Sequence, residues 1–534
     1  MADKKMASPP RPTVMRQGAR AALGGLLALA ALTLMAVLLA GESAASVEAP
    51  GASRGPSPAG TEVLAPAVAS ADDDGAYLNC RFGVGQAQNA VTAYDITSLN
   101  VGWYANWRAQ ANPARPGGIE YVQMLRVSDG AAWGGREHPD PPTYSPSGDA
   151  LAAIVAAHPG SLWLVGNEPD CIWQDNVLPQ SYATVYHDAY AAIKAHDPTA
   201  KVSVGGIVQP TPLRLGYMDA VLDAYASRYG EPLPTDAWNV HSYILREERG
   251  SWGCDIPPGS AADQGELYTL GDTDDIAIFK QRLRAFRGWM RDRGYRDAPL
   301  IITEYGTLMP YYGLAPHEMY YDSQGNPFDE DRAWGYMEST FDFLLTASDP
   351  DTGYPADQNR LVQRWLWYSL DDPDYGGPLF DPYTTEPLSL AVSLADYTGA
   401  ISPHVDLLAV DVRQAGPVPL SPSEPATITL KARVSNVGNV AITEPFHVRF
   451  LDDQGQPIGE DRVITPSLAG CAATQAVTVT WSAVEPGAHQ VQVVVDPDDG
   501  VSEPDETNNV AYGVVLVAEH RVFLPLVVRG HGSP

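Results

Sequence analysis

Over residues 76–400, short apolar runs of strand length alternate with longer stretches in which apolar residues recur at helical spacing. Helical patterns of this kind cover residues 181–196 and 274–294. The strand-like runs are RFGVGQ (81–86), VGWYANW (101–107), IEYVQMLRV (119–127), SLWLVGNEP (161–169), KVSVGGIV (201–208), DAWNVHSYI (236–244), PLIITEYG (299–306) and RWLWYSL (364–370). Eight strands with interposed helices in about 320 residues predict an α/β domain with the (β/α)8 TIM barrel fold. A Rossmann-type sheet is disfavoured, because no GxGxxG motif follows the first strand.

The pattern changes after residue 400, where strand-like runs follow one another with almost no helix signal. Turn residues separate these runs at short intervals, which is typical of an antiparallel sandwich. The runs are ATITLKARVSNV (426–437), FHVRFLDD (446–453), AVTVTWSAV (476–484), HQVQVVVDP (489–497) and VAYGVVLV (510–517). We therefore expect an all-β Ig-like sandwich domain over residues 405–518 to follow the barrel.

The two ends of the chain carry a different signal. Basic residues precede an uncharged run at 21–40, and Ser43-Ala44-Ala45 offers a small-residue cleavage site. Residues 1–45 are therefore predicted to be a signal peptide or, because the run is long enough to span a bilayer, an uncleaved membrane anchor. Residues 46–75 are rich in Ala, Gly, Ser and Pro and predict a disordered linker. The apolar C-terminal tail, 519–534, either packs as a last strand or serves as an export or sorting tag.

Composition argues against two classes of protein, disordered chains and nucleic-acid-binding proteins. The 45% hydrophobic and 19% charged residues exclude wholesale disorder. A formal charge of −31 argues against nucleic acid as a partner, because phosphate contacts need clustered Lys and Arg. The N-terminal segment predicts a secreted or extracellular cell-surface location, with association to the envelope through that segment if it is retained.

Four cysteines are present, and export places them where disulfides form. Cys171 and Cys254 fall in loops after the fourth and sixth predicted strands, at the same mouth of the barrel, so a disulfide between them is possible. Cys80 and Cys471 have no evident partner. No CxxC spacing or His/Asp cluster suggests a metal, and we expect neither a metal nor another cofactor.

Two glutamates stand out because each lies at the C-terminal end of a predicted barrel strand. Glu168 occurs in LWLVGNEPD and Glu304 in LIITEYG, on strands four and seven. Barrel enzymes place catalytic groups at that rim, and strands four and seven lie across the barrel from each other. Opposed carboxylates suit glycosidic bond cleavage, in which one protonates the leaving oxygen and the other attacks the anomeric carbon or activates water. The alternative is that each glutamate makes an ordinary salt bridge.

These segments resemble the catalytic strands of clan A glycoside hydrolases. The resemblance implies that Glu168 is the acid/base, Glu304 the nucleophile and Asn167 a contact to the sugar 2-hydroxyl. WYANW (103–107), IEYVQM (119–124) and WNVHSY (238–243) further resemble the Asl1-like, family 128 group of β-1,3-glucan hydrolases. That group usually has a Pro before the Met of strand three, where this chain has Gln123, and the inserts near 250–272 and 308–335 exceed a minimal barrel. Other clan A families with similar strand ends, such as families 39 and 5, are alternatives.

Strand parity selects further site residues. His241 and Tyr243 share a face of the sixth predicted strand. We expect Tyr243 to donate to the Glu304 carboxylate and lower its pKa. The resemblance to the clan implies that His241 contacts the nucleophile or the sugar; the alternative is a hydrogen-bonded core residue. Arg126, on strand three, either holds the nucleophile ionised, binds a substrate hydroxyl or forms a structural ion pair.

Two residues are expected to bind substrate from strands two and eight. Trp367, near the end of strand eight, is predicted to form a stacking floor for a sugar ring. Asn106 shares a face of strand two with Tyr104, while Trp103 and Trp107 share the other, and parity alone does not say which pair faces the ligand.

The acidic run DPDDGVSEPDETNN (496–509), with its flanks, resembles the closing hairpin of CARDB-type domains, an Ig-like sandwich named for bacterial cell adhesion. The resemblance spans about 405–518 and implies a binding or spacer module. The run does not match the EF-hand pattern, so a solvated hairpin turn is favoured over a calcium site.

Together these features predict a secreted or surface-tethered retaining glycoside hydrolase acting on a polysaccharide or oligosaccharide, with a β-glucan as one candidate. The alternative is a non-catalytic carbohydrate-binding or adhesion protein on the same barrel. Transglycosylation by the same two glutamates is a third reading, because it shares the covalent intermediate with hydrolysis.

Overall fold

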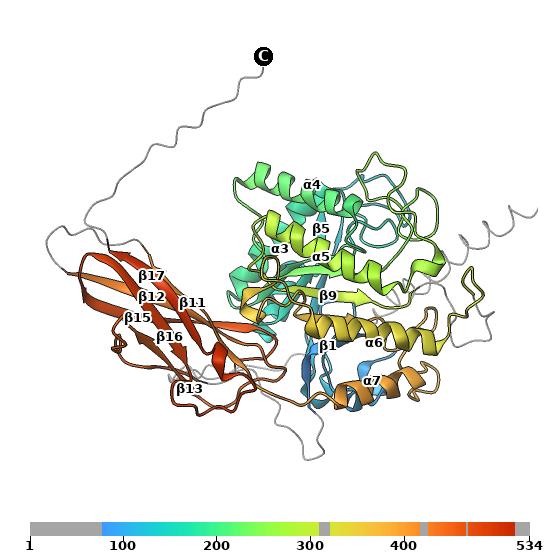
Figure 1. The fold of residues 1–534 in the computed structure, drawn as a ribbon. Coiled ribbons are helices and arrows are strands. Elements are labelled where there is room, and N and C mark those ends of the chain that lie inside the picture. Colours follow the sequence, from blue (N-terminus) through green and yellow to red (C-terminus); the bar gives the residue numbers. More distant parts are fainter. Residues whose placement is uncertain (1–76, 309–320, 417–424, 466–467, 518–534) are drawn as a thin grey trace, which may run out of the picture.

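The computed structural model describes residues 77–308, 321–416, 425–465 and 468–517 (Figure 1). The predicted signal or anchor, the linker and the C-terminal tail lie outside these residues. Among the described helices, none has both the length and the apolar character needed to cross a membrane.

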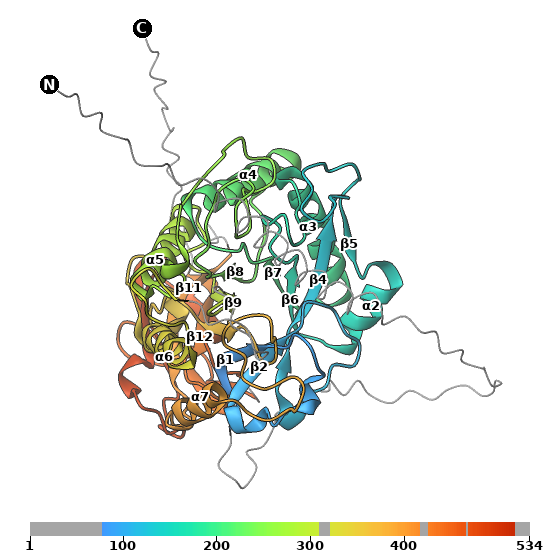
Figure 2. The same cartoon turned by 90° about the vertical axis from the view of Figure 1, so that its right-hand side faces the viewer.

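The first domain is a closed barrel of parallel strands with helices outside (Figure 2). Hydrogen-bonded order runs β3-β2-β1-β10-β9-β8 and β4-β6-β7, and bridges Ser203–Ala237 and Ile207–Val240 link β7 to β8. The prediction of a (β/α)8 barrel is confirmed, with the third strand split into β3 and β4. The strands are β1 (Asn79–Gly85), β2 (Val101–Ala105), β3 (Glu120–Tyr121), β4 (Gln123–Ser128), β6 (Leu162–Val165), β7 (Lys201–Val204), β8 (Trp238–His241), β9 (Leu300–Tyr305) and β10 (Arg364–Trp367).

Helices cover the outside of the barrel because each has one apolar stripe. In α5, for example, Phe279, Leu283 and Phe286 are buried, and Asp275 caps its first turn by accepting from Ala277 N and Ile278 N. Short β5 (Thr143–Ser145) pairs antiparallel with β4. The helices are α2 (Gly148–Ala157), α3 (Pro179–His196), α4 (Pro212–Tyr229), α5 (Ile276–Asp292), α6 (Glu330–Thr346) and α7 (Ser389–Gly399), with 3-10 turns at Val91–Ala93, Thr97–Leu99, Pro116–Gly118, Leu270–Asp272 and Pro355–Asp357.

The second domain is the expected all-β sandwich. One sheet has the order β11-β12-β15 and the other β14-β13-β16-β17, all antiparallel. Alternate residues such as Leu430, Val448 and Val493 are buried between the sheets. The acidic run forms the turn between β16 and β17 and contains the 3-10 turn Glu506–Asn508. The strands are β11 (Leu407–Ala415), β12 (Ala426–Asn436), β13 (Phe446–Leu451), β14 (Arg462–Ile464), β15 (Ala473–Val484), β16 (Gly487–Val495) and β17 (Val510–Val517).

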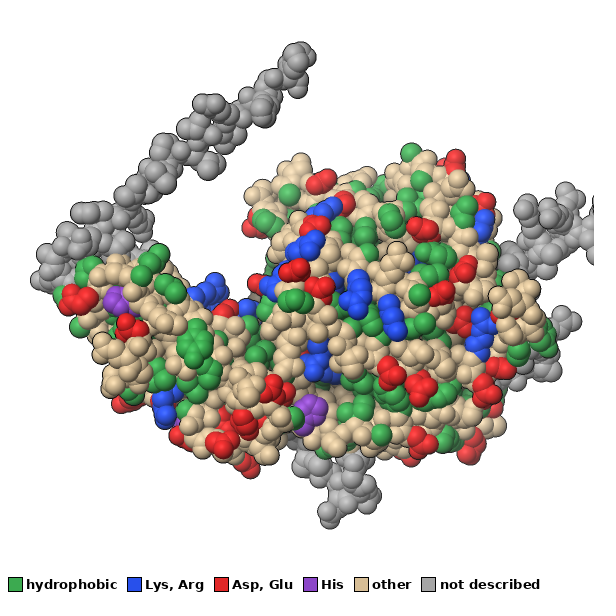
Figure 3. All heavy atoms as spheres, in the orientation of Figure 1, with side chains coloured by type: hydrophobic (Ala, Val, Ile, Leu, Met, Phe, Trp, Pro, Cys, Tyr) green, Lys and Arg blue, Asp and Glu red, His purple; other side chains and the backbone are tan. Residues whose placement is uncertain are grey.

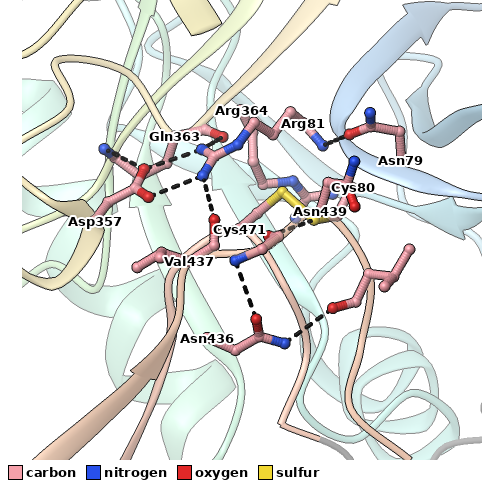
Figure 4. The surroundings of a disulfide bond; sticks show 12 residues. Asn79, Cys80, Arg81, Asp357, Gln363, Arg364, Asn436, Val437, Asn439 and Cys471 are labelled. Carbon is pink, nitrogen blue, oxygen red and sulfur yellow. Dashed lines mark hydrogen bonds and ion pairs between the residues drawn. A yellow bond between two sulfur atoms is a disulfide. The ribbon is translucent and has the colours of Figure 1, made fainter. Parts of the chain in front are cut away.

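The sandwich is attached to the barrel at the N-terminal ends of the strands, opposite the mouth (Figures 1 and 4). Cys80, at the start of β1, forms a disulfide with Cys471 of the sandwich. Next to it, the buried Arg81 donates to Asp357 over 2.8 and 3.0 Å and to the carbonyl of Val437 over 2.8 Å. The two cysteines without an evident partner in the sequence therefore hold the two domains together.

Acidic and basic side chains are interspersed on the face of the barrel seen in Figure 3, rather than basic ones gathered alone.

Candidate active site

The two glutamates meet at the C-terminal end of the barrel. Glu304 lies in β9, and Glu168 follows β6 with a φ of +43°, an uncommon left-handed backbone for a residue other than glycine. Both side chains line one cavity of about 400 Å³. The residues themselves are only 4% and 6% exposed, so the carboxyls are shielded from bulk water while remaining on the cavity wall.

His241, at the end of β8, lies between the glutamates. Its Nδ1 is 2.9 Å from Oε1 of Glu168 and 3.6 Å from Oε2 of Glu304. One carboxylate oxygen of each glutamate and a ring nitrogen all lie within 4.8 Å of one another. The carboxyl groups are therefore close enough to act on the same substrate atom.

Glu304 is held by hydrogen-bond donors from the segments that follow β2 and β8. Trp107 Nε1 donates to Oε1, and the Tyr243 hydroxyl donates to Oε2 over 3.2 Å. The pKa of Glu304 is raised to about 7, mainly by burial and also by the charge of Glu168, while the two donors lower it. The donors thus favour the ionised form that a nucleophile requires.

Glu168 is also buried. Its pKa is raised to about 8, mainly by burial and also by Asp170 and Asp175, while Arg214 and Arg126 lower it. Burial raises the pKa of both carboxyls, but the Trp107 and Tyr243 donors favour the ionised form of Glu304; unequal surroundings of this kind suit an acid and a nucleophile.

A chain of buried side chains lies behind His241. Nε2 is 3.1 Å from the hydroxyl of Thr303, which donates to Asn239 Oδ1 over 2.8 Å. Because the Thr303 hydroxyl donates its only proton to Asn239, it can only accept in its contact with His241, and Nε2 of the ring is the donor. Burial lowers the pKa of His241, so the ring is neutral and Nδ1 carries a lone pair. That lone pair faces Glu168, an arrangement that fits a protonated carboxyl there.

The disulfide Cys171–Cys254 adjoins Glu168. It joins the loop after β6 to the loop after β8, and both cysteines line the cavity. Cys254 Sγ is 3.9 Å from Oε2 of Glu168, and Cys171 N donates to the Glu168 carbonyl over 3.0 Å. The structure thus pairs the cysteines expected at the mouth, and their disulfide lies directly against the Glu168 carboxyl.

Three further residues expected in the site also line the cavity. Asn167 is buried, and its Oδ1 has no hydrogen-bond partner among the described residues. Asn106 accepts from the Tyr121 hydroxyl. Arg126 lies on the Glu168 side and donates to Asp175 over 2.6 Å. It therefore forms an ion pair near Glu168 rather than a contact with Glu304.

The structure corrects the expectation for Trp367. Its side chain is 1% exposed, packs edge-on against Tyr305 and donates to the carbonyl of Gly377 over 2.8 Å. Trp367 belongs with Trp365 to the core between strands and helices, whereas Leu366 packs inside the barrel. The next residue, Tyr368, lines the cavity instead. His241 is likewise fully buried and positions the glutamates from behind the cavity wall.

Further aromatic residues complete the cavity, and of those described next only Trp107 is among the candidates considered from the sequence. Trp107 and Tyr368 lie near Glu304 with ring centroids 5.5 Å apart, and Trp133 and Trp173 form a second pair at 5.7 Å. Such surfaces suit the C–H faces of sugar rings. A sequence signal existed for Trp107, which ends the aromatic segment after β2.

Two groups of side chains bring three potential ligand atoms within 4.8 Å of one another: Glu168, His241 and Glu304, and Glu168 with the two cysteines. Sulfurs in a disulfide are not the thiolates that metals bind. In the other group, Nδ1 of His241 is within hydrogen-bond distance of Glu168 at 2.9 Å and lies 3.6 Å from Glu304. The geometry is that of coupled acid and base groups.

A family model identifies the second domain. Residues 406–513 match the CARDB model. The C-terminal sandwich is a CARDB domain. A solved domain of a putative cell surface protein from Methanosarcina acetivorans is also similar to it, at 30% identity, with a TM-score of 0.18 and coverage of 22% of this chain and 95% of that one.

The barrel is similar to solved structures of GH128 endo-beta-1,3-glucanases. The subgroup I protein from Amycolatopsis mediterranei, in complex with laminaritriose, is 18% identical with a TM-score of 0.37, covering 59% of this chain and 98% of that one. The subgroup II protein from Pseudomonas viridiflava is 18% identical with a TM-score of 0.38, covering 59% and 96%. No curated protein sequence matches the chain.

The CARDB domain lies at the opposite end of the barrel from the cavity. Its described residues contribute none of the cavity lining. The candidate site is therefore built by the barrel loops and strand ends.

Proposed function

We propose that this protein is a retaining glycoside hydrolase that acts on a polysaccharide or oligosaccharide. The observation that carries the proposal is the pairing of Glu168 and Glu304, with carboxylate oxygens within 4.8 Å on the wall of one cavity. Retaining enzymes have carboxyls about 5–5.5 Å apart, whereas inverting enzymes need about 6.5–9.5 Å to admit a water molecule. The short separation favours direct attack by one glutamate.

In the proposed reaction, ionised Glu304 attacks the anomeric carbon while Glu168 gives its proton to the leaving oxygen. The glycosidic C–O bond breaks as the Glu304–carbon bond forms. Glu168, now ionised, removes a proton from water, whose oxygen attacks the same carbon and releases Glu304. The Trp107 and Tyr243 donors stabilise Glu304 as a leaving carboxylate, and the buried setting of Glu168 returns it to the acid form.

A β-1,3-glucan is the substrate we propose to test first, because the strand motifs resemble that group of hydrolases. The aromatic pairs Trp107–Tyr368 and Trp133–Trp173 give the cavity surfaces for more than one sugar ring.

We also propose that the protein is secreted or tethered at the cell surface. The apolar N-terminal segment and the two disulfides in the described part of the chain support this, since disulfides persist in oxidising compartments.

The test compares wild type with Glu168→Gln and Glu304→Gln on laminari-oligosaccharides and a panel of β-glucans, measuring reducing ends and the anomer first released. Both variants are expected to lose at least about a thousandfold in kcat. The wild type is expected to release a product with the same anomeric configuration as the substrate. Glu338→Gln, exposed on α6, is the matched control and should retain full activity. Binding of glycans without release of products by the wild type would overturn the proposal in favour of a binding protein.

Azide assigns the two roles separately. In Glu304→Ala, azide can enter from the vacated face and give a glycosyl azide of inverted configuration. In Glu168→Ala, the glycosyl-enzyme still forms on an activated aryl glycoside, and azide attacks it to give retained configuration. The reverse pattern would exchange the roles of the two glutamates.

A further inference from the structure

We propose that the Cys171–Cys254 disulfide is a positioning element for the acid/base, occupying the side of the Glu168 carboxyl that water would otherwise reach and so favouring its protonated form. This inference rests on the proposed function, because it assigns a role within the same reaction. It concerns the disulfide that joins the loops after β6 and β8, not the two carboxyl groups.

The two oxygens of Glu168 have different neighbours. Oε1 faces Nδ1 of His241 at 2.9 Å, and Oε2 faces Sγ of Cys254 at 3.9 Å. A disulfide sulfur carries no hydrogen, so it cannot donate to an ionised oxygen as a thiol, hydroxyl or water could. An ionised Glu168 would therefore leave one oxygen against an apolar group, which disfavours the charged form.

The disulfide is itself part of the wall. Cys171 is fully buried and Cys254 is 8% exposed. Replacing both by alanine removes two sulfur atoms from the immediate surroundings of Oε2, and the adjoining cavity supplies the water to fill that space. Water at this position would donate to the carboxylate and stabilise it.

Other contacts hold the same loops, so the disulfide is not their sole support. Trp173 Nε1 donates to the carbonyl of Gly253 over 3.1 Å, joining the two loops a second time. Asp175 accepts from the backbone N–H groups of Asn167 and Val127. We therefore expect the loops to retain their fold without the disulfide, so that the effect on Glu168 can be observed.

Replacing the two cysteines removes none of the charged groups that face Glu168. They are the acidic Asp170, Asp175 and Glu304, the basic Arg214 and Arg126, and the titratable ring of His241. Burial is the largest cause of the raised pKa of Glu168. Loss of burial by hydration should consequently lower that pKa, and the alkaline limb of the pH profile should move to lower pH.

The experiment measures kcat/KM against pH for wild type, Cys171→Ala/Cys254→Ala and the control Cys80→Ala/Cys471→Ala. The control removes the other disulfide, at the far end of the barrel. We expect the alkaline limb to move down only in the first variant, with activity above the limb reduced about three- to tenfold and activity near pH 6 changed less than about twofold. A lower thermal midpoint with an unmoved alkaline limb, or the same movement in the control, would overturn the inference.

A measurement without turnover separates this inference from the proposed function. Infrared difference spectra of the carboxyl, with Glu168→Gln subtracted, give the protonation midpoint of Glu168 directly. A lower midpoint in Cys171→Ala/Cys254→Ala supports the inference even if no glycan is hydrolysed, and an equal midpoint overturns it. Absence of hydrolysis by the wild type would count against the proposed function alone.

Discussion

Nδ1 of His241 lies 2.9 Å from Oε1 of Glu168, and the same atom lies 3.6 Å from Oε2 of Glu304. One buried ring therefore contacts both carboxyls. Because burial lowers the pKa of His241, the ring adds no positive charge between them at neutral pH. Because the neutral ring places no positive charge between Glu168 and Glu304, two negative charges there would repel each other, and the state with one protonated and one ionised glutamate is favoured.

This coupling predicts a bell-shaped dependence of kcat/KM on pH. Burial raises the pKa of Glu304 to about 7 and that of Glu168 to about 8. Below the lower limb the nucleophile is protonated, and above the upper limb the acid has lost its proton. We expect maximal activity between these limbs, measured with one substrate in buffers of constant ionic strength. A profile still rising as pH falls below 5 would contradict the assignment.

The hydroxyl of Thr303 is predicted to fix the tautomer of His241. Thr303→Val removes the acceptor for Nε2–H and frees the ring to place its proton on Nδ1, where it would donate to an ionised Glu168. Activity should fall about tenfold and the alkaline limb should move to lower pH. Thr303→Ser keeps the hydroxyl and should restore both.

Nitrogen NMR of the His241 ring measures the tautomer without substrate. The wild type and Thr303→Ser should show a protonated Nε2, and Thr303→Val a mixture. The same tautomer in all three proteins would contradict this role and leave Thr303 with a packing role only.

Tyr243→Phe should act on the opposite limb of the pH profile. The lost hydroxyl donates to Oε2 of Glu304 over 3.2 Å, and without it the ionised nucleophile is less stable. The pKa of Glu304 should rise, so the acidic limb moves to higher pH while the alkaline limb stays. Tyr217→Phe is a suitable control, because its buried hydroxyl donates to the carbonyl of Val177 rather than to a glutamate. Equal effects of both substitutions on the limb would refute the specific role of Tyr243.

The two glutamates were predictable because strand pattern and barrel topology act together. An apolar strand places its last residues at a known end of the barrel, whichever way its side chains alternate. Which side chains of a strand face the cavity was harder to predict. Trp365 and Trp367 have the parity of the helix-facing side of β10, and an aromatic residue suits either side.

Other features depend on contacts that local pattern does not encode. Trp107 has a φ of +60°, so strand alternation ends there and cannot predict its direction toward Glu304. Cys80 and Cys471 are 391 residues apart, and their pairing follows from how the two domains dock. The loops after β6 and β8 bring Cys171 and Cys254 together because both belong to the same mouth, which the barrel topology did indicate.

Gly206 is predicted to be required for the position of His241. A Cβ atom at this residue would lie 2.5 Å from Cδ2 and 2.7 Å from Nε2 of the ring, closer than real contacts allow. Gly206→Ala should displace the ring from both glutamates and lower kcat about a hundredfold. Gly216→Ala, in α4 with open space around its Cβ position, should leave kcat unchanged and slightly raise stability. Full activity of Gly206→Ala would show that the ring can shift without consequence.

The disulfide between Cys80 and Cys471 is predicted to stabilise the two domains as one unit. It joins residues 391 apart in the sequence, for which the chain-entropy relation gives about 6 kcal/mol, while disulfides in proteins stabilise by about 5 kcal/mol at most. The ion pair of Arg81 with Asp357 and the contact to Val437 remain in Cys80→Ala/Cys471→Ala, so the domains should stay docked but unfold at a lower temperature. Calorimetry should show one transition in the wild type and separate barrel and sandwich transitions in the variant. Because the site lies at the other end of the barrel, kcat at low temperature should not change, and a loss of activity without a change in unfolding would contradict a purely structural role.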